Sequence, residues 1–247
     1  MSARVSRERI EEARALMLEL FPDGFEELDA AEAVELAAYT GREGEERFRR
    51  AFPEAAGQDV APGWLDAWKA FHRPVRVGPL WVGPPWHSPP ADAIPVVIDP
   101  GRAFGTGGHA TTRLCLELLL ACERGSLVDL GCGSGVLAIA AAKLGFAPVT
   151  ALDADPAAVE AAARNVTANG VVAAVERADV LADALPDARV AVANIARDPV
   201  ERVGARLGSM TLVASGYPRG ERPAPAGWRH VEGRETDGWA ADRYVRL

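Results

Sequence analysis

The sequence predicts a doubly wound α/β domain with a mostly parallel sheet over residues 94–247, preceded by a small α+β lobe over residues 1–60. Three observations predict this. Hydrophobic residues make up 49% of the chain and charged residues 25%, the balance of a folded globular protein. From residue 94 onward, strand-like and helical patterns alternate. The strand-like runs are continuously apolar, as in parallel strands covered on both faces.

The first 60 residues combine helical and alternating patterns. Residues 6–20 have apolar side chains three and four positions apart, which predicts an amphipathic helix. Two short runs, 25–28 and 33–38, predict a hairpin. Residues 43–52 predict a second helix, which ends at Pro53. This mixture predicts the small α+β lobe.

Residues 61–93 are rich in tryptophan and proline. Four of the six tryptophans lie here, namely Trp64, Trp68, Trp81 and Trp86. Large aromatic side chains gain most from burial. We therefore expect a packed connector between the lobe and the α/β domain.

Short apolar runs and helical periods then alternate through the α/β domain. The predicted strands are residues 126–130, 149–152, 171–176, 190–193 and 210–215, and the predicted helices are residues 136–144, residues 156–169 and one that begins near Leu114. In open sheets of this class, ligands bind at the carboxyl ends of the strands. We expect the functional residues in the loops that follow those ends.

A glycine-rich run, Val128-Asp129-Leu130-Gly131-Cys132-Gly133-Ser134-Gly135, joins the first of these strands to a helix. Its backbone N–H groups and the helix N-terminus face whatever binds there, and glycine permits close approach. The dinucleotide fingerprint has glycine at its first, third and sixth positions, whereas this run has it at the first, third and fifth. The spacing favours a methyltransferase loop over a dehydrogenase loop.

An acidic residue is expected at the end of the next strand, where it can accept the ribose hydroxyls of a nucleoside ligand. Asp153, which follows Gly131 by 22 residues, has this position. Asp155 precedes Pro156 and is expected to cap the next helix.

The chain lacks the motifs of several other enzyme classes. The chain has no GxxxxGK[ST] phosphate loop and no HExxH zinc motif, and Gly133-Ser134-Gly135 is one residue short of the GxSxG elbow of serine hydrolases. The three cysteines have no CxxC spacing, so neither a zinc site nor a disulfide framework is indicated. We expect no metal, and a reducing cytoplasm as the compartment.

The formal net charge of -8 disfavours sequence-independent binding to nucleic acid, and a basic protein partner suits it better. The N-terminus is charged and has no apolar signal core, and no run of about 18 apolar residues occurs. Neither secretion nor membrane insertion is expected.

Residues 99–112, with the sequence DPGRAFGTGGHATT, form the second unusual stretch. Its four glycines, its aromatic residue and its three threonines suit a cover over a ligand, and the simpler alternative is a surface connector. His109 has two open interpretations. It is either a helix-capping or core residue, or it takes a direct functional part.

Four motifs together resemble the ribosomal protein L11 methyltransferase family across about residues 60–215. They are DPGRAFGTGGHATT, VDLGCGSGVLAIAAAKLG, TALDADPAAVEAAARNVTANG and VANI. The FGTGxHxTT pattern in the first is far more specific than the glycine run. Members of that family use S-adenosylmethionine to methylate amino groups of ribosomal protein L11, chiefly lysine side chains and the N-terminal α-amine. The resemblance implies a Rossmann-like methyltransferase sheet, this cofactor, and L11 as partner.

The resemblance also assigns site residues. Those assigned to the cofactor are Phe104, Gly105, Thr106, Thr112, Asp129, Gly131, Gly133, Gly135, Asp153, Asp179 and Asn194. The glycine loop would hold the methionine part, Asp153 the ribose and Asp179 the adenine, and residues 104–106 would lie over the cofactor. Asn194 would lie beside the transferred methyl. It is the expected catalytic residue, orienting the attacking amine through its side-chain oxygen.

The chain departs from the family in two places. The family has a βαββαβ substrate-recognition lobe, and here its first strand is absent or reduced to the residues before Ser6, so the lobe is shortened. After Asn194, a leucine-rich helix and a glycine-led strand are replaced by Ile195-Ala196-Arg197-Asp198-Pro199 and a compact segment, 204–208. The alternatives are a different lysine-bearing substrate protein or a non-catalytic cofactor-binding module. Nucleic-acid methylation is disfavoured, because Asn194-Ile195-Ala196 has no Pro-Pro-aromatic platform.

Overall fold

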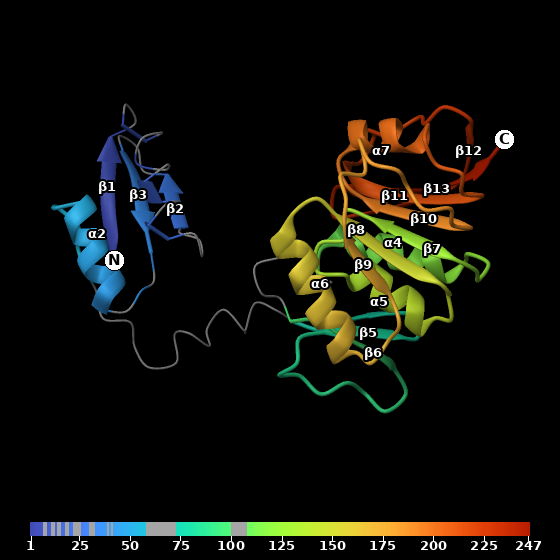
Figure 1. The fold of residues 1–247 in the computed structure, drawn as a ribbon, viewed down its shortest axis with the longest axis horizontal. Helices are drawn as coiled ribbons and strands as arrows, with labels where there is room; N and C mark the ends of the chain where they lie inside the picture. The colour runs from blue at the N-terminus through green and yellow to red at the C-terminus, as the bar shows by residue number, and fades with distance from the viewer. Residues whose placement is uncertain are drawn as a thin grey trace. The chain divides into compact units, whose positions relative to one another are not determined.

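The computed structural model describes residues 1–6, 9–10, 13, 16–17, 20–21, 26–29, 33–38, 40, 42–57, 73–99 and 108–247. The chain forms two compact units, Met1–Ala67 and Trp68–Leu247 (Figure 1). None of the helices in the described ranges is long and apolar enough to cross a membrane.

The N-terminal unit contains a three-stranded antiparallel sheet of β1 (Ser2–Ser6), β2 (Glu26–Asp29) and β3 (Ala33–Ala37), in the order β1-β3-β2. The predicted hairpin is confirmed as the β2–β3 pair. The predicted second helix is confirmed as α2 (Arg42–Ala51). Its Phe48 is fully buried. The ring centroid of Phe48 lies 5.6 Å from that of Phe21 and 5.2 Å from that of Phe52.

The sequence left two alternatives for the first strand of this unit, and the structure has it at the residues up to Ser6, as β1. β1 pairs with β3 along its whole length, from Ser2 opposite Ala37 to Ser6 opposite Ala33. Ala3 and Val5 are buried, because alternate residues of an edge strand face the core. Of the predicted helix over residues 6–20, the described Ile10, Ala13 and Met17 are buried.

The larger unit begins earlier than the predicted boundary at residue 94. β4 (Val75–Val77), β5 (Leu80–Gly83) and β6 (Ile94–Val97) form a small sheet in which β5 is antiparallel to β4 and parallel to β6. Residues 73–93 of the predicted connector are therefore part of this unit. The physical reason is that aromatic and β-branched residues such as Trp81 and Val82 favour strands that pack on a core. Trp64 and Trp68 lie outside the described residues.

The main sheet of the larger unit has seven strands. They are β7 (Leu127–Leu130), β8 (Val149–Asp153), β9 (Ala174–Arg177), β10 (Val190–Asn194), β11 (Thr211–Pro218), β12 (Trp228–Thr236) and β13 (Trp239–Arg246). Their order is β12-β13-β11-β10-β7-β8-β9, and only β13 runs against its neighbours (Figure 1). The predicted doubly wound, mostly parallel sheet is confirmed.

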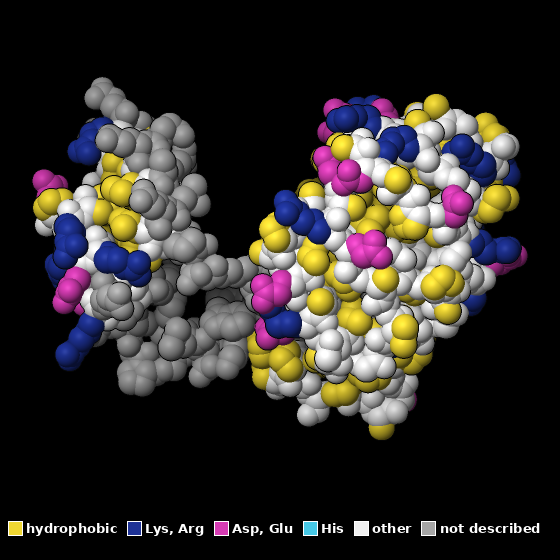
Figure 2. Space-filling model, viewed as in Figure 1, with side chains coloured by type: hydrophobic (Ala, Val, Ile, Leu, Met, Phe, Trp, Pro, Cys, Tyr) yellow, Lys and Arg dark blue, Asp and Glu magenta, His cyan; other side chains and the backbone are white. Residues whose placement is uncertain are grey.

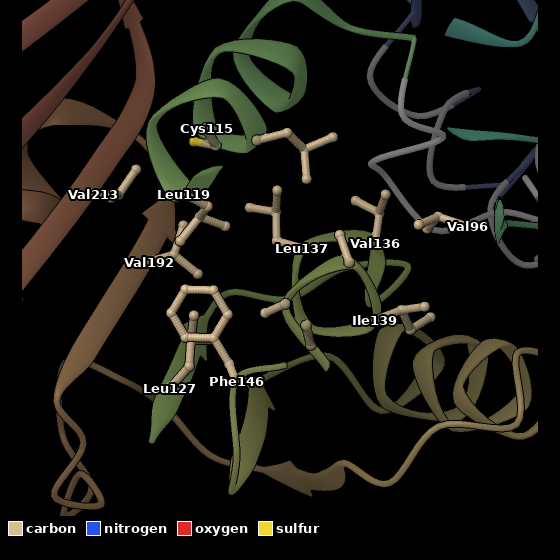
Figure 3. Close-up of a cluster of buried hydrophobic side chains, with 14 of the residues drawn as sticks. Val96, Cys115, Leu119, Leu127, Val136, Leu137, Ile139, Phe146, Val192 and Val213 are labelled. Carbon is tan, nitrogen blue, oxygen red and sulfur yellow. The ribbon is translucent and has the colours of Figure 1, made fainter. Parts of the chain in front are cut away.

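The two faces of this sheet have different helical covers. α4 (Ala110–Leu120), α5 (Val136–Lys143) and α6 (Pro156–Ala168) pack on one face, where Leu127, Val192 and Val213 meet α4 and α5 side chains (Figure 3). α7 (Arg197–Gly204) packs on the other face through Val200 and Val203. Each fully buried aliphatic side chain contributes about 1.5–3 kcal/mol. Burial on both faces explains why these strands are continuous apolar runs in the sequence.

Three elements differ from the sequence prediction. α4 begins at Ala110 rather than near Leu114, because His109 caps it. Residues 197–204, for which no helix was predicted, form α7. β12 and β13 form an unpredicted hairpin, whose two-residue turn Asp237-Gly238 has φ angles of 51° and 79°. Asp-Gly is the favoured pair for a turn with two positive φ angles.

Candidate functional site

The strand order reverses between β7 and β10, which is the position where open α/β sheets bind ligands. The carboxyl ends of three neighbouring strands meet there. The glycine loop follows β7, Asp153 ends β8 and Asn194 ends β10. The amides of Gly131 and Cys132 both donate to the carbonyl oxygen of Leu152, at 2.8 and 2.9 Å. This anchors the loop to the end of β8.

The glycine loop has a backbone that only glycine adopts easily. Gly131, Gly133 and Gly135 have φ angles of 75°, 53° and 80°. A Cβ atom on Gly131 would lie 2.6 Å from Cγ2 of Ile195. Glycine at 131 therefore leaves room for the Ile195 side chain, and the loop leads directly into the first turn of α5, whose N–H groups can bind a ligand.

Asp153 holds the glycine loop and the start of the next loop. Its Oδ2 accepts the amide of Gly133 at 2.9 Å, and its Oδ1 accepts the amide of Asp155 at 3.0 Å. Each carboxylate oxygen keeps a second lone pair, so two hydroxyl donors can still be bound. Asp155 caps α6 through the amide of Ala157, as predicted.

Asp129 lies beneath the loop and is 1% exposed. Its Oδ2 accepts the amide of Ala138 at 3.1 Å, and its Oδ1 has no hydrogen-bond partner within the described residues. Burial, with a smaller effect from the charge of Asp153, raises the pKa of this carboxyl to about 7. Burial also raises the pKa of the neighbouring Cys132 thiol, which keeps it uncharged and a poor nucleophile.

Asn194 and Thr112 meet although they are 82 residues apart in the chain. Asn194 Nδ2 donates to Thr112 Oγ1 over a long distance of 3.4 Å, and Thr112 is fully buried in the first turn of α4. Asn194 Oδ1 is buried and accepts no hydrogen bond from the described part of the chain. A buried acceptor without a donor is costly, so this oxygen is available to an incoming N–H group.

His109 forms the N-cap of α4, since its Nδ1 accepts the amide of Thr111. Its ring lies against Trp239 at a centroid distance of 5.0 Å. The capping interpretation of His109 is confirmed, and a direct functional part stays a prediction. An ion pair of Arg113 with Asp237, at 2.5 Å, brings the tip of the β12–β13 hairpin to the same end of α4.

The structure thus brings most of the predicted site residues to one edge of the sheet. Asp179 lies at this edge too, just beyond β9, but it is exposed and its carboxylate accepts the amide of Leu181 at 2.9 Å. Phe104, Gly105 and Thr106 lie outside the described residues. Across the described ranges, no group of three or more His, Cys, Asp or Glu side chains could hold a metal ion.

Sequence reasoning assigned no role to two residues that shape the site, Gly216 and Ile195. Gly216 bulges out of β11 with φ 99°, and a Cβ there would lie 2.3 Å from the carbonyl oxygen of Ile195. Ile195 therefore packs between Gly216 and Gly131, directly after Asn194. A glycine within a strand pattern indicates a bulge or a close backbone approach, and that signal at Gly216 was present in the sequence.

The site fits a ligand that has a ribose and a charged amino-acid end. This fit rests on the positive-φ backbone of the glycine loop at the start of α5 and the free lone pairs of Asp153, together with the buried acceptor of Asn194. With the sheet order, these features define the larger unit as a Rossmann-like methyltransferase domain. A family model described as Ribosomal protein L11 methyltransferase (PrmA) matches residues 7–216, and the chain belongs to that family.

Curated relatives support the same family. Proteins named ribosomal protein L11 methyltransferase are 42% identical over 197 residues in Symbiobacterium thermophilum and 38% identical over 208 residues in Pelobacter propionicus. These alignments cover 72% and 74% of this chain. The chain spans 64% and 66% of the lengths of those relatives.

A solved structure gives the same fold. The crystal structure of ribosomal protein L11 methylase from Lactobacillus delbrueckii subsp. bulgaricus is 26% identical, with a TM-score of 0.60. The match covers 71% of this chain and 99% of that one.

Proposed function

We propose that this protein binds S-adenosylmethionine at the carboxyl ends of β7 and β8 and transfers methyl groups to lysine side chains and the N-terminal α-amine of ribosomal protein L11. The observation that carries the proposal is the buried, unpartnered Oδ1 of Asn194 at the edge that also holds the glycine loop and Asp153. An acceptor at that place can hold an amine next to a bound nucleoside cofactor. The family membership supports the same activity.

The cofactor would be held by the groups already described. The glycine loop would hold the methionine part, with Asp129 beneath it, and Asp153 would accept the ribose hydroxyls. Thr112 and residues 104–106 would contact the cofactor, and Asp179 would approach its adenine. When bound, S-adenosylmethionine would supply a methyl group that an amine nitrogen can attack, with S-adenosylhomocysteine as the leaving group.

Asn194 would act on the attacking amine. Its Oδ1 accepts an amine N–H, which directs the nitrogen lone pair toward the methyl group and limits the approach to one orientation. A lysine of pKa 10.4 must lose its proton first, which costs about 4.6 kcal/mol at pH 7. Partial desolvation at this site would disfavour the ammonium form and reduce that cost.

The substrate part of the proposal rests on the family, because the relatives are named after L11 and the match reaches into the N-terminal unit at residue 7. We propose the cytoplasm as the compartment, because the substrate named for the relatives is a ribosomal protein.

The test is the mass of purified, unmethylated L11 after incubation with enzyme and cofactor. We expect the mass to increase in whole methyl steps, and no increase when cofactor is omitted. If L11 keeps its mass while labelled cofactor marks another protein in a cell extract, the substrate is a different protein. If calorimetry shows cofactor binding and no protein is labelled, the chain is a non-catalytic binding module.

A further inference from the structure

Helix α6 carries a buried asparagine that joins two separate parts of the site. Asn165 is 3% exposed. Its Oδ1 accepts the amide of Asp99 at 3.1 Å, and its Nδ2 donates to the carbonyl oxygen of Ser134 at 2.9 Å. Asp99 follows β6 and begins the stretch DPGRAFGTGGHATT, and Ser134 belongs to the glycine loop. One rigid amide therefore bridges the two motifs that the proposed function assigns to the cofactor.

We propose that Asn165 is a positioning residue for cofactor binding, which sets the distance between the glycine loop and the start of the 99–112 stretch. The inference rests on the proposed function. The requirement is specific, because the side chain must accept from one backbone amide and donate to one backbone carbonyl at the same time. Aspartate has the same shape, but its ionised form only accepts, so it would repel the Ser134 carbonyl.

The same helix provides a matched control one turn later. Asn169 bonds to the last residue of β6, since its Oδ1 accepts the amide of Val97 at 2.9 Å and its Nδ2 donates to the carbonyl of Val97 at 2.6 Å. Its Nδ2 also donates to the backbone carbonyl of Asn165 at 2.8 Å, within α6. It makes no hydrogen bond to the glycine loop within the described residues. Asn169 thus fastens β6 to α6 without joining the two motifs.

The experiment measures binding of S-adenosylhomocysteine by calorimetry to the full chain and to Asn165→Asp and Asn169→Ala. At pH 8 we expect Asn165→Asp to bind about tenfold more weakly than wild type. Burial at this position should raise the pKa of the new carboxyl. As the pH falls toward 5, the carboxyl gains a proton and can donate to the Ser134 carbonyl, so the affinity of the variant should approach that of wild type. Asn169→Ala should lower the unfolding temperature and leave the affinity close to wild type.

Thermal unfolding of each variant shows whether a loss of affinity is caused only by a loss of folded protein. If Asn165→Asp is unfolded at pH 8, Asn165→Ser takes its place, because a hydroxyl is too short to reach both partners. A second readout is the exchange rate of the Asp99 amide in the ligand-free protein. It should rise in the Asn165 variants and stay unchanged in Asn169→Ala.

Two results would overturn the inference alone. One is a wild-type protein that binds and methylates while the Asn165 variants keep its affinity at every pH. The other is an equal loss of affinity in Asn169→Ala, which would make the effect a general one of α6. A wild-type protein that binds no S-adenosylhomocysteine would instead overturn the proposed function, and this inference with it.

Discussion

Among single residues, Asp129 is the described carboxyl whose pKa rises on folding, from an ordinary value of 3.8 to about 7. At a pH between these two values, the Asp129 carboxyl is therefore protonated in the folded protein and ionised in the unfolded chain. The contribution of this group to stability is fully present below the unfolded pKa, and it is lost as the pH rises through the folded pKa. Burial of an ionised carboxylate with an unpartnered Oδ1 is the cause.

We predict that Asp129→Asn weakens this pH dependence. Because asparagine is neutral at every pH, the fall in the free energy of unfolding between about pH 5 and pH 8 should be smaller in the variant. Urea unfolding at several pH values measures the free energy of unfolding of the variant and of wild type. Parallel curves for Asp129→Asn and wild type would show that Asp129 does not titrate in this range.

Asp153→Ala should remove most of the cofactor affinity. Two hydrogen bonds from ribose hydroxyls to a charged acceptor contribute enough that we expect a loss of at least about 100-fold, measured by calorimetry with S-adenosylhomocysteine. Asp155→Ala is the control, because it removes the cap of α6, at a cost of about 1 kcal/mol, without touching the ribose position. Unchanged binding by Asp153→Ala would remove the ribose assignment.

Asn194→Ala should separate binding from turnover. The cofactor affinity is expected to stay near wild type, and kcat is expected to fall on the order of 100-fold, because the attacking amine loses its acceptor. Asn194→Asp keeps an oxygen at the same place and should lose less. Wild-type turnover by Asn194→Ala would show that the Oδ1 does not orient the amine.

At the scale of elements, the bulge in β11 is what sets the position of Ile195 against the glycine loop. Gly216 and Gly220 both have positive φ angles, 99° and 86°. A Cβ at Gly216 would meet the backbone of Ile195, whereas nothing lies within 4 Å of one at Gly220. Both glycines therefore have a backbone that disfavours other residues, but only at Gly216 would a side chain also clash with its surroundings.

We predict that Gly220→Ala costs about 1–2 kcal/mol of stability, the cost of a left-handed alanine. Gly216→Ala should cost at least about 2 kcal/mol more, because backbone atoms cannot move aside as a side chain can. It should also weaken cofactor binding through Ile195, and Gly220→Ala should not. Equal unfolding free energies for the two variants would contradict the close packing of β11 on Ile195.

The elements that were predicted and those that were missed differ in how they are buried. β7, β8 and β10 are covered on both faces, so local apolar runs were enough to locate them. β12 is half exposed along most of its length, and it becomes a strand through its pairing with β13. β4 and β5 were missed because they are only three and four residues long and lie in the Trp- and Pro-rich tract of residues 61–93, where no local pattern indicates a strand.

At the scale of the whole molecule, the charge is divided unevenly between the two units. Residues 1–67 contain sixteen Asp and Glu and eight Arg, whereas residues 68–247 contain nineteen acidic and nineteen basic residues. The net charge of -8 thus belongs to the N-terminal unit. On the visible face of the larger unit, acidic and basic side chains are interspersed (Figure 2).

An acidic unit should attract a basic protein substrate over a distance that salt shortens. We predict that the KM for L11 rises several-fold between about 0.05 M and about 0.3 M salt. The affinity for S-adenosylhomocysteine should change little, because the proposed cofactor site lies in the unit without net charge. A KM independent of salt would exclude electrostatic attraction as a source of substrate affinity.

By itself, the sequence determined the doubly wound sheet, the glycine loop and the strand-end positions of Asp153 and Asn194. These depend on local patterns, namely apolar runs, glycine spacing and strand ends. Only the tertiary structure decided that Thr112 meets Asn194, that Gly216 packs on Ile195, and that Asn165 joins Asp99 to Ser134. The physical reason is that each of these contacts joins segments far apart in the chain, and the order of strands in the sheet brings them together.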